Sequence, residues 1–152
     1  MKVLKGNYFE SKVRRETVTE DGTQAKVVSL FVVDALSFTE CESRVTEFVS
    51  SFTSGEFEVL TEARAAYSEI VFADDPTDEK WYKLRCVFVT LDEKSGKQKK
   101  SKYTYLVQAG TIDGAKRNFD EVMKGTMVDY YIDGIHEVAV EDIVEREVKD
   151  GE

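Results

Sequence analysis

Two stretches of the chain correspond to each other when the sequence is aligned with itself. Residues 30–39 and residues 104–113 share an order of apolar and polar positions with a shift of 74. A shift of 73 relates two further pairs of segments, 8–13 with 81–86 and 68–71 with 141–144. Because such self-similarity is the signature of a repeated structural unit, it constrains the fold more than any single motif does.

The correspondence predicts two copies of one unit, over residues 5–73 and 80–148. The segment between them, 74–79, contains the only proline of the chain and a cluster of acids, which is a composition typical of a linker. We expect the two copies to form one compact domain, because 152 residues are enough to bury a sizeable core.

Each copy contains one amphipathic helix signal. Ser37 is followed three residues later by Glu40, which is the spacing of a capping box, and Gly55 is a candidate stop. In the second copy Thr111 is the expected cap and Gly125 the expected stop. Both apolar faces have the same phase and comprise Phe38, Cys41, Val45, Phe48, Val49 and Phe52, then Ile112, Ala115, Phe119, Val122 and Met123.

Strand signals surround each helix. Turn residues separate 8–18 from 24–34 and 81–92 from 101–109, so each pair predicts a β-hairpin. Two shorter extended segments are expected after each helix, at 56–61, 65–72, 128–133 and 137–144. The predicted fold is α+β, with two tandem β-β-α-β-β repeats in which one helix packs on an antiparallel sheet.

The net charge of -9, from 21 basic and 30 acidic residues, disfavours a general binder of duplex DNA. The charge is uneven, however, because residues 94–102 hold five lysines and no acid. The simplest interpretation of this segment is a solvated hairpin tip, and the alternative is a local contact for phosphate or for an acidic partner.

Basic and aromatic residues alternate on the second predicted hairpin. Period-two alternation places Lys83 and Arg85 on one face, with Trp81, and places Tyr82 and Leu84 on the other. Such a surface stacks single-stranded bases in some sheet proteins. The candidate nucleic-acid-binding residues are Trp81, Lys83, Arg85, Lys99, Lys100, Lys102 and Tyr103, and Lys12, Arg14 and Lys26 occupy comparable places in the first copy. The interpretation that we favour has the aromatic residues in the core and the basic residues solvated.

The sequence offers no catalytic or metal-binding constellation. Its one histidine, His136, follows a turn, and its two cysteines, Cys41 and Cys86, are best explained as buried structural thiols. They supply no ligand set for zinc, and the acidic linker lacks the spacing of a calcium-binding EF-hand loop. We therefore predict no catalytic residue, no metal and no cofactor.

Several strings resemble an uncharacterised family of short proteins from gut anaerobic bacteria and their phages. These strings are residues 33–40, 54–57, 67–69, 90–96 and 123–130. The resemblance extends over nearly the whole chain and implies an intracellular bacterial or phage setting. It carries no activity and no site residue.

Three functions fit these observations. The first is a non-enzymatic binding or adaptor protein whose partner is another protein or a second copy of the chain. The alternative is a single-stranded nucleic-acid or nucleotide binder that uses the basic aromatic hairpin. The third is an enzyme that uses carboxylates in a cleft between the copies. A cytoplasmic location is expected, without a membrane partner, because neither a signal-peptide stretch nor a run of about 18 apolar residues is present.

Overall fold

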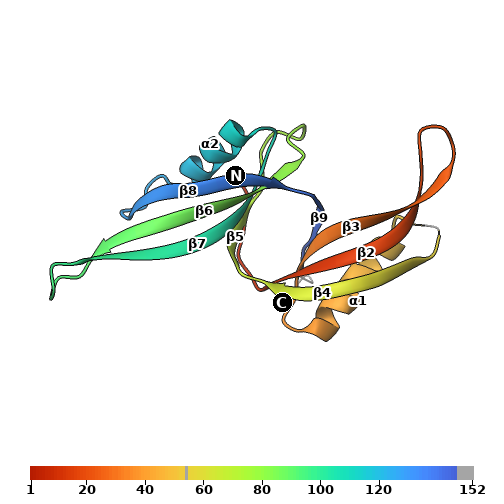
Figure 1. Cartoon of the computed structure of the whole chain (residues 1–152), viewed down its shortest axis with the longest axis horizontal. Helices are drawn as coiled ribbons and strands as arrows, with labels where there is room; N and C mark the ends of the chain where they lie inside the picture. Colours follow the sequence, from red (N-terminus) through yellow and green to blue (C-terminus); the bar gives the residue numbers. More distant parts are fainter. Residues whose placement is uncertain (54, 147–152) are drawn as a thin grey trace, which may run out of the picture. The chain divides into compact units, whose positions relative to one another are not determined.

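A computed structural model describes residues 1–53 and 55–146 of the chain. The described chain is a mixed α+β structure with two helices and two sheets, in which most neighbouring strands are antiparallel. It divides into two compact units (Figure 1). Among the described residues, unit 1 contains Met1–Lys5 and Tyr67–Val138, and unit 2 contains Gly6–Ala66 and Ala139–Arg146. The predicted α+β class is confirmed.

Unit 2 is built on a long hairpin. β2 (Tyr8–Val18) and β3 (Gln24–Asp34) pair antiparallel in continuous register along their whole length. The turn between them holds Gly22 at φ +83°, a conformation that glycine adopts without steric cost. β4 (Phe57–Ala65) pairs antiparallel with β2, and β9 (Val140–Val144) pairs parallel with β3. The strand order is β4-β2-β3-β9.

Helix α1 (Phe38–Ser50) covers one face of this sheet (Figure 1). Its apolar positions recur every three to four residues, so Cys41, Val45 and Val49 lie on one buried side. The core that they close also contains Phe9, Val13, Phe31, Val33, Ala35 and Val144. Burial of these apolar side chains is the main force that holds the helix on the sheet.

Unit 1 repeats this plan on a five-stranded sheet. β6 (Lys80–Leu91) and β7 (Gln98–Ala109) form its long antiparallel hairpin, and β8 (Asp129–Val138) pairs antiparallel with β6. β5 (Tyr67–Val71) pairs parallel with β7, and the short β1 (Val3–Leu4) pairs antiparallel with β5. The strand order is therefore β1-β5-β7-β6-β8.

Helix α2 (Ile112–Met123) covers one face of this sheet and begins at the predicted cap, Thr111. Ala115 and Phe119 on its inner side are fully buried. They pack in a core with Val71, Tyr82, Leu84, Cys86, Tyr105, Val107 and Ala109. Neither helix of the described chain is long and apolar enough to cross a membrane.

The extended segments after the helices differ from the prediction. β4 continues to Ala65 and β8 to Val138, so the predicted boundaries at 61 and 133 are wrong. A single residue, Ala66 or Ala139, then leads into the next strand. Because a tight hairpin needs about two loop residues, the chain cannot fold back beside the strand it has just formed.

The strand that follows each short link therefore joins the other sheet. β5 pairs with β7 in unit 1, and β9 pairs with β3 in unit 2, and both pairs are parallel. The prediction of purely antiparallel sheets is wrong at these two strands. The predicted repeats, 5–73 and 80–148, each contribute residues to both units. Residues 147 and 148 lie outside the described chain.

The helix ends follow local chemistry. α1 ends at Ser50, with Ser51 as its C-cap, so the predicted stop at Gly55 is wrong. The Ser51 N–H donates to the Phe48 carbonyl, which satisfies part of the helix end without a glycine. In α2 the predicted stop is confirmed, because Gly125 directly follows the C-cap and has φ +84°.

The capping box of α1 leads to a first prediction. The Ser37 hydroxyl accepts from the Glu40 N–H at 3.1 Å, and the Glu40 carboxylate accepts from the Leu36 N–H at 3.2 Å. We expect Ser37→Ala to lower the free energy of unfolding by about 1 kcal/mol, because it leaves a helix N–H unsatisfied. Urea unfolding followed by circular dichroism measures this loss. Ser43→Ala, the same change at an exposed position inside α1, is the control and should not destabilise the protein.

Candidate functional site

The hairpin of unit 1 has a basic surface opposite α2. The core under α2 contains Tyr82 and Leu84, so strand alternation turns Lys83 and Arg85 to the opposite side of the sheet. The uninterrupted register between β6 and β7 brings further side chains to the same side. We call this surface the basic face and define it by Lys83, Arg85, Lys100, Lys102, Thr104, Tyr131 and His136.

The basic face is ordered in rows across three strands. Each row has one residue from β7, one from β6 and one from β8, and successive rows are about 7 Å apart along the strands. From the middle of the sheet toward the hairpin tip, the rows are Thr104–Arg85–Gly134, Lys102–Val87–Tyr131 and Lys100–Val89–Asp129. The basic side chains therefore form a line along the hairpin.

A pocket of about 240 Å³ opens at the first of these rows. It is lined by Lys83, Arg85, Thr104, Gly134 and His136. Register explains the cluster, because Lys83 lies opposite His136 and Arg85 lies between Thr104 and Gly134. Gly134 lies beside the guanidinium, and a Cβ added there would be in ordinary van der Waals contact with Arg85 Nη2, at 3.6 Å.

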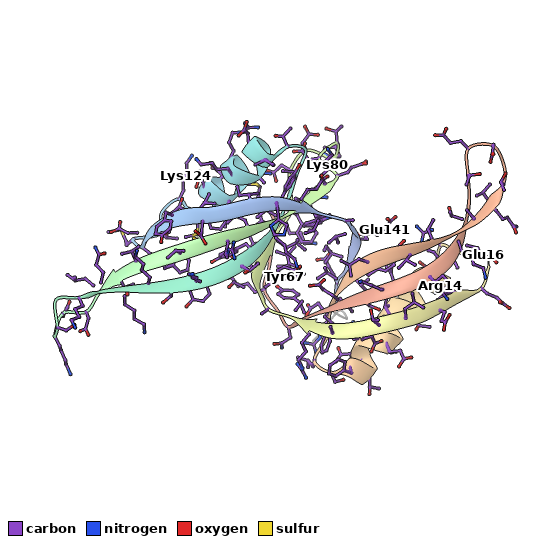
Figure 2. The ribbon with its side chains drawn as sticks, in the orientation of Figure 1. Arg14, Glu16, Tyr67, Lys80, Lys124 and Glu141 are labelled. Carbon is purple, nitrogen blue, oxygen red and sulfur yellow. The ribbon has the colours of Figure 1, made fainter. Side chains whose placement is uncertain are left out.

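The two basic side chains of the pocket, Arg85 and Lys83, each contact a neighbouring side chain. Arg85 Nε lies 3.4 Å from Asp133 Oδ2, an exposed ion pair that neutralises part of its charge. Lys83 Nζ lies 5.6 Å from the centroid of the Tyr67 ring, a cation–π contact. Tyr67, labelled in Figure 2, comes from β5. These contacts orient the pocket and leave it with a net positive lining.

The structure separates the predicted nucleic-acid residues into two groups. Lys83, Arg85, Lys100 and Lys102 share the basic face, whereas Lys99 and Tyr103 lie on the side of α2. Tyr103 pairs with Cys86, and its ring centroid lies 5.1 Å from that of Phe88. One flat ligand on the basic face therefore cannot contact all the residues of the predicted set.

Trp81 lies on the basic side of β6 but does not form part of the exposed surface. Its side chain is only 3% exposed. The ring packs edge-on against Phe72, with centroids 5.5 Å apart and planes at 85°. A base cannot stack on a ring that is buried in this way, so the predicted role of Trp81 as a stacking residue does not fit the fold.

Tyr131 is the aromatic side chain that the basic face does present. It is 44% exposed, and Lys100 Nζ lies 5.8 Å from its ring centroid. Its neighbour Tyr130 points the other way, where its hydroxyl donates to Asp120 Oδ1 of α2 at 2.9 Å. Tyr131 is absent from the predicted set, because its face depends on the register of β8 against β6, which shifts between Arg85 and Cys86.

The comparable residues of unit 2 have a different environment. Arg14 Nη1 lies 3.2 Å from Glu58 Oε2, and Arg14 and Glu16 both belong to β2 (Figure 2). The cavity there, of about 130 Å³, has a mixed lining of Arg14, Arg15, Glu16, Lys26, Glu56, Phe57 and Glu58. Acidic neighbours thus balance the basic residues of unit 2.

The cysteines are buried, as expected for structural thiols. Burial raises the pKa of Cys41 to about 12 and that of Cys86 to about 11. Both thiols are therefore protonated at neutral pH, and a thiol is a much weaker nucleophile than a thiolate. His136 lies on the basic face, in the pocket, and not beside either cysteine.

The acidic linker between the predicted repeats forms turns of its own. Asp75 Oδ1 accepts from the Thr77 N–H at 2.9 Å and from the Thr77 hydroxyl at 2.7 Å, and these bonds lower the pKa of the Asp75 carboxyl. Over residues 1–53 and 55–146, no group of three or more His, Cys, Asp or Glu side chains is placed to hold a metal ion.

Comparison with known proteins gives one match. No curated protein and no solved structure matches the chain. A family model described as Domain of unknown function (DUF4494) matches residues 7–146, which include most of both units and the whole basic face. The chain therefore belongs to the DUF4494 family.

Proposed function

We propose that this protein acts by binding, without catalysis, and that its ligand is an anion that carries phosphate groups and docks on the basic face. The observation that carries the proposal is the pocket of about 240 Å³ lined by Lys83, Arg85 and His136. Thr104 lines the same pocket, and its hydroxyl adds a donor beside Lys83 and Arg85. Arginine and lysine beside a hydroxyl form the kind of donor set that phosphate oxygens accept from.

The charge of the whole protein makes this cluster informative. With a net charge of -9, the average surface repels an anion, so a local group of basic side chains does not follow from composition. One of the corresponding residues of unit 2, Arg14, pairs with Glu58, as Arg85 does with Asp133 in unit 1. The two linings differ in their acids: Glu16, Glu56 and Glu58 line the unit 2 cavity beside its basic residues, whereas the unit 1 pocket is lined by Lys83, Arg85, Thr104, Gly134 and His136.

Calorimetric titration with inorganic triphosphate at low salt tests the proposal. We expect the wild-type chain to bind, with an affinity that falls as salt is added, because the interaction is electrostatic. Lys83→Ala and Arg85→Ala should each weaken binding about tenfold or more, since each removes charge-assisted hydrogen bonds. Circular dichroism should show unchanged folds, because both side chains lie at the surface of the sheet.

Lys99→Ala is the matched control for these variants. It removes the same charge from the same hairpin, but on the side of α2. We expect its affinity for triphosphate to equal that of the wild type. The proposal fails if the wild-type chain does not bind triphosphate, or if Lys99→Ala weakens binding as much as Lys83→Ala does.

A protein-binding role is the second candidate, and the sheet edges favour it. β4 and β8 are the outer strands of their sheets, and neither pairs on its outer side with another described strand. Native mass spectrometry separates the candidates: a dimer would support pairing of two copies, and a monomer would leave the anion as the favoured ligand.

We also propose that the two halves of the sequence arose as copies of one unit. The order β2-β3-α1-β4-β5 recurs as β6-β7-α2-β8-β9, and both helices begin at a hydroxyl cap, Ser37 or Thr111. A bacterial or phage source and a cytoplasmic location stay predictions from the sequence.

A further inference from the structure

We infer that the ligand of the basic face is single-stranded nucleic acid, with one base stacked on Tyr131 and the phosphate chain running along the line of cations. This inference rests on the proposed binding of phosphate groups at the Lys83–Arg85 pocket. It adds a base-stacking position and a direction to that site. The pocket alone does not identify this ligand. The identification depends on Tyr131 and Lys102, which form the row next to the pocket.

The aromatic ring of Tyr131 lies close to the pocket. Tyr131 lies in the row next to Arg85 and Thr104, about 7 Å farther toward the hairpin tip. Lys102 stands in the same row and Lys100 in the one after it. A ligand bound in the pocket by one phosphate would therefore meet a ring and two further cations as it continues along the hairpin.

The ring of Tyr131 is accessible to a ligand. Tyr131 is 44% exposed, whereas the preceding residue of the strand, Tyr130, lies on the side of α2 and donates to Asp120. A flat ring beside lysines offers each base a stacking surface, and its charged neighbours attract the backbone. A peptide of acidic residues alone would match the lysines but would supply no ring to stack on Tyr131.

Stacking on Tyr131 and the net charge both favour a single strand over a duplex as the ligand. Bases in a duplex are already stacked and paired, so they cannot lie on Tyr131 without being pulled out. The overall charge of -9 also opposes the many phosphate contacts that a duplex requires. An unpaired strand needs only the short basic line that this hairpin provides.

Fluorescence anisotropy with a labelled oligothymidylate of about 12 nucleotides tests the inference, a length within the range of small single-strand binding sites. Unlabelled polyphosphate of matched charge serves as competitor, because it carries phosphate without bases. We expect the oligonucleotide to bind about tenfold more tightly than polyphosphate, which corresponds to one stacked base. A duplex of the same length should compete less well than the single strand.

Tyr131→Ala should remove this preference and leave the affinity for polyphosphate unchanged. Tyr131→Phe should keep the preference, because it keeps the ring. Tyr103→Ala is the matched control, since Tyr103 is 43% exposed on the same sheet but on the side of α2. It should bind the oligonucleotide as the wild type does. Lys102→Ala should reduce the slope of log affinity against log salt by about 0.7, the value for one phosphate contact on a single strand.

The outcomes separate this inference from the proposed function. If polyphosphate and oligonucleotide bind equally and Tyr131→Ala changes neither affinity, the stacking inference is overturned while phosphate binding stands. If polyglutamate competes as well as the oligonucleotide does, the ligand is an acidic protein segment and the inference is also overturned. If neither phosphate probe binds, both proposals fail.

Discussion

Phe119→Ala will strongly destabilise unit 1, with an expected loss of about 3–5 kcal/mol in the free energy of unfolding. Phe119 is fully buried at the centre of α2. Its ring meets Tyr105 edge-on, with centroids 4.8 Å apart, and meets Tyr130 at 5.7 Å. The substitution therefore removes apolar burial and two aromatic contacts and leaves a cavity under the helix.

The single tryptophan of the chain makes this measurement direct. Trp81 lies in unit 1 and is 3% exposed, so its fluorescence changes when that unit unfolds. We expect the urea midpoint of this signal to fall by more than about 1 M in Phe119→Ala. Ile112→Ala is the control, because Ile112 belongs to the same helix but is 53% exposed. Equal shifts in the two variants would contradict the assignment of Phe119 as the centre of the core.

The sequence predicted those parts of the fold that neighbouring residues decide. The hairpin 8–18/24–34 is confirmed to the residue, and Ser37 caps α1 as predicted, although the Glu40 carboxylate accepts from the Leu36 N–H and not from that of Ser37. Period-two alternation also placed Lys83 and Arg85 opposite Tyr82 and Leu84 correctly. These features depend on the local backbone period and on hydrogen bonds between residues close in the chain, both of which are visible in one sequence.

Such local signals do not predict which strands pair when the strands are distant in the sequence. Alternation could not say that β5 and β9 would each join the sheet of the other hairpin, because that outcome follows from the one-residue links at Ala66 and Ala139. The candidate site shows the same limit. The burial of Trp81 and the exposure of Tyr131 depend on Phe72 and on the shifted register of β8, respectively, which only the folded sheet determines.

Because β9 belongs to unit 2, a substitution in β9 should affect hydrogen exchange in strands that are distant in the sequence. Val144 follows unit 1 in sequence, yet it is 5% exposed in the core of unit 2, where it pairs with Val33. Val144→Asp buries a carboxylate without a partner, a change that costs about 3–5 kcal/mol. We expect hydrogen exchange to show lost protection in β2 and β3, far away in sequence, while β6 and β7 keep theirs.

The matching change in the other strand should give the reverse pattern. Val71 is fully buried in the core of unit 1 and pairs with Val107, although its strand directly follows β4 of unit 2. Val71→Asp should therefore deprotect β6 and β7 and spare β2 and β3. Val18→Asp, at a position 67% exposed on β2, is the control and should leave both hairpins protected. Deprotection that instead followed sequence proximity, with Val144→Asp affecting β6 and β7, would contradict the strand pairing. A crossed pattern would be the direct signature of the observed strand pairing, in which β5 joins the sheet of β7 and β9 joins the sheet of β3, as the one-residue links that prevent a tight hairpin favour.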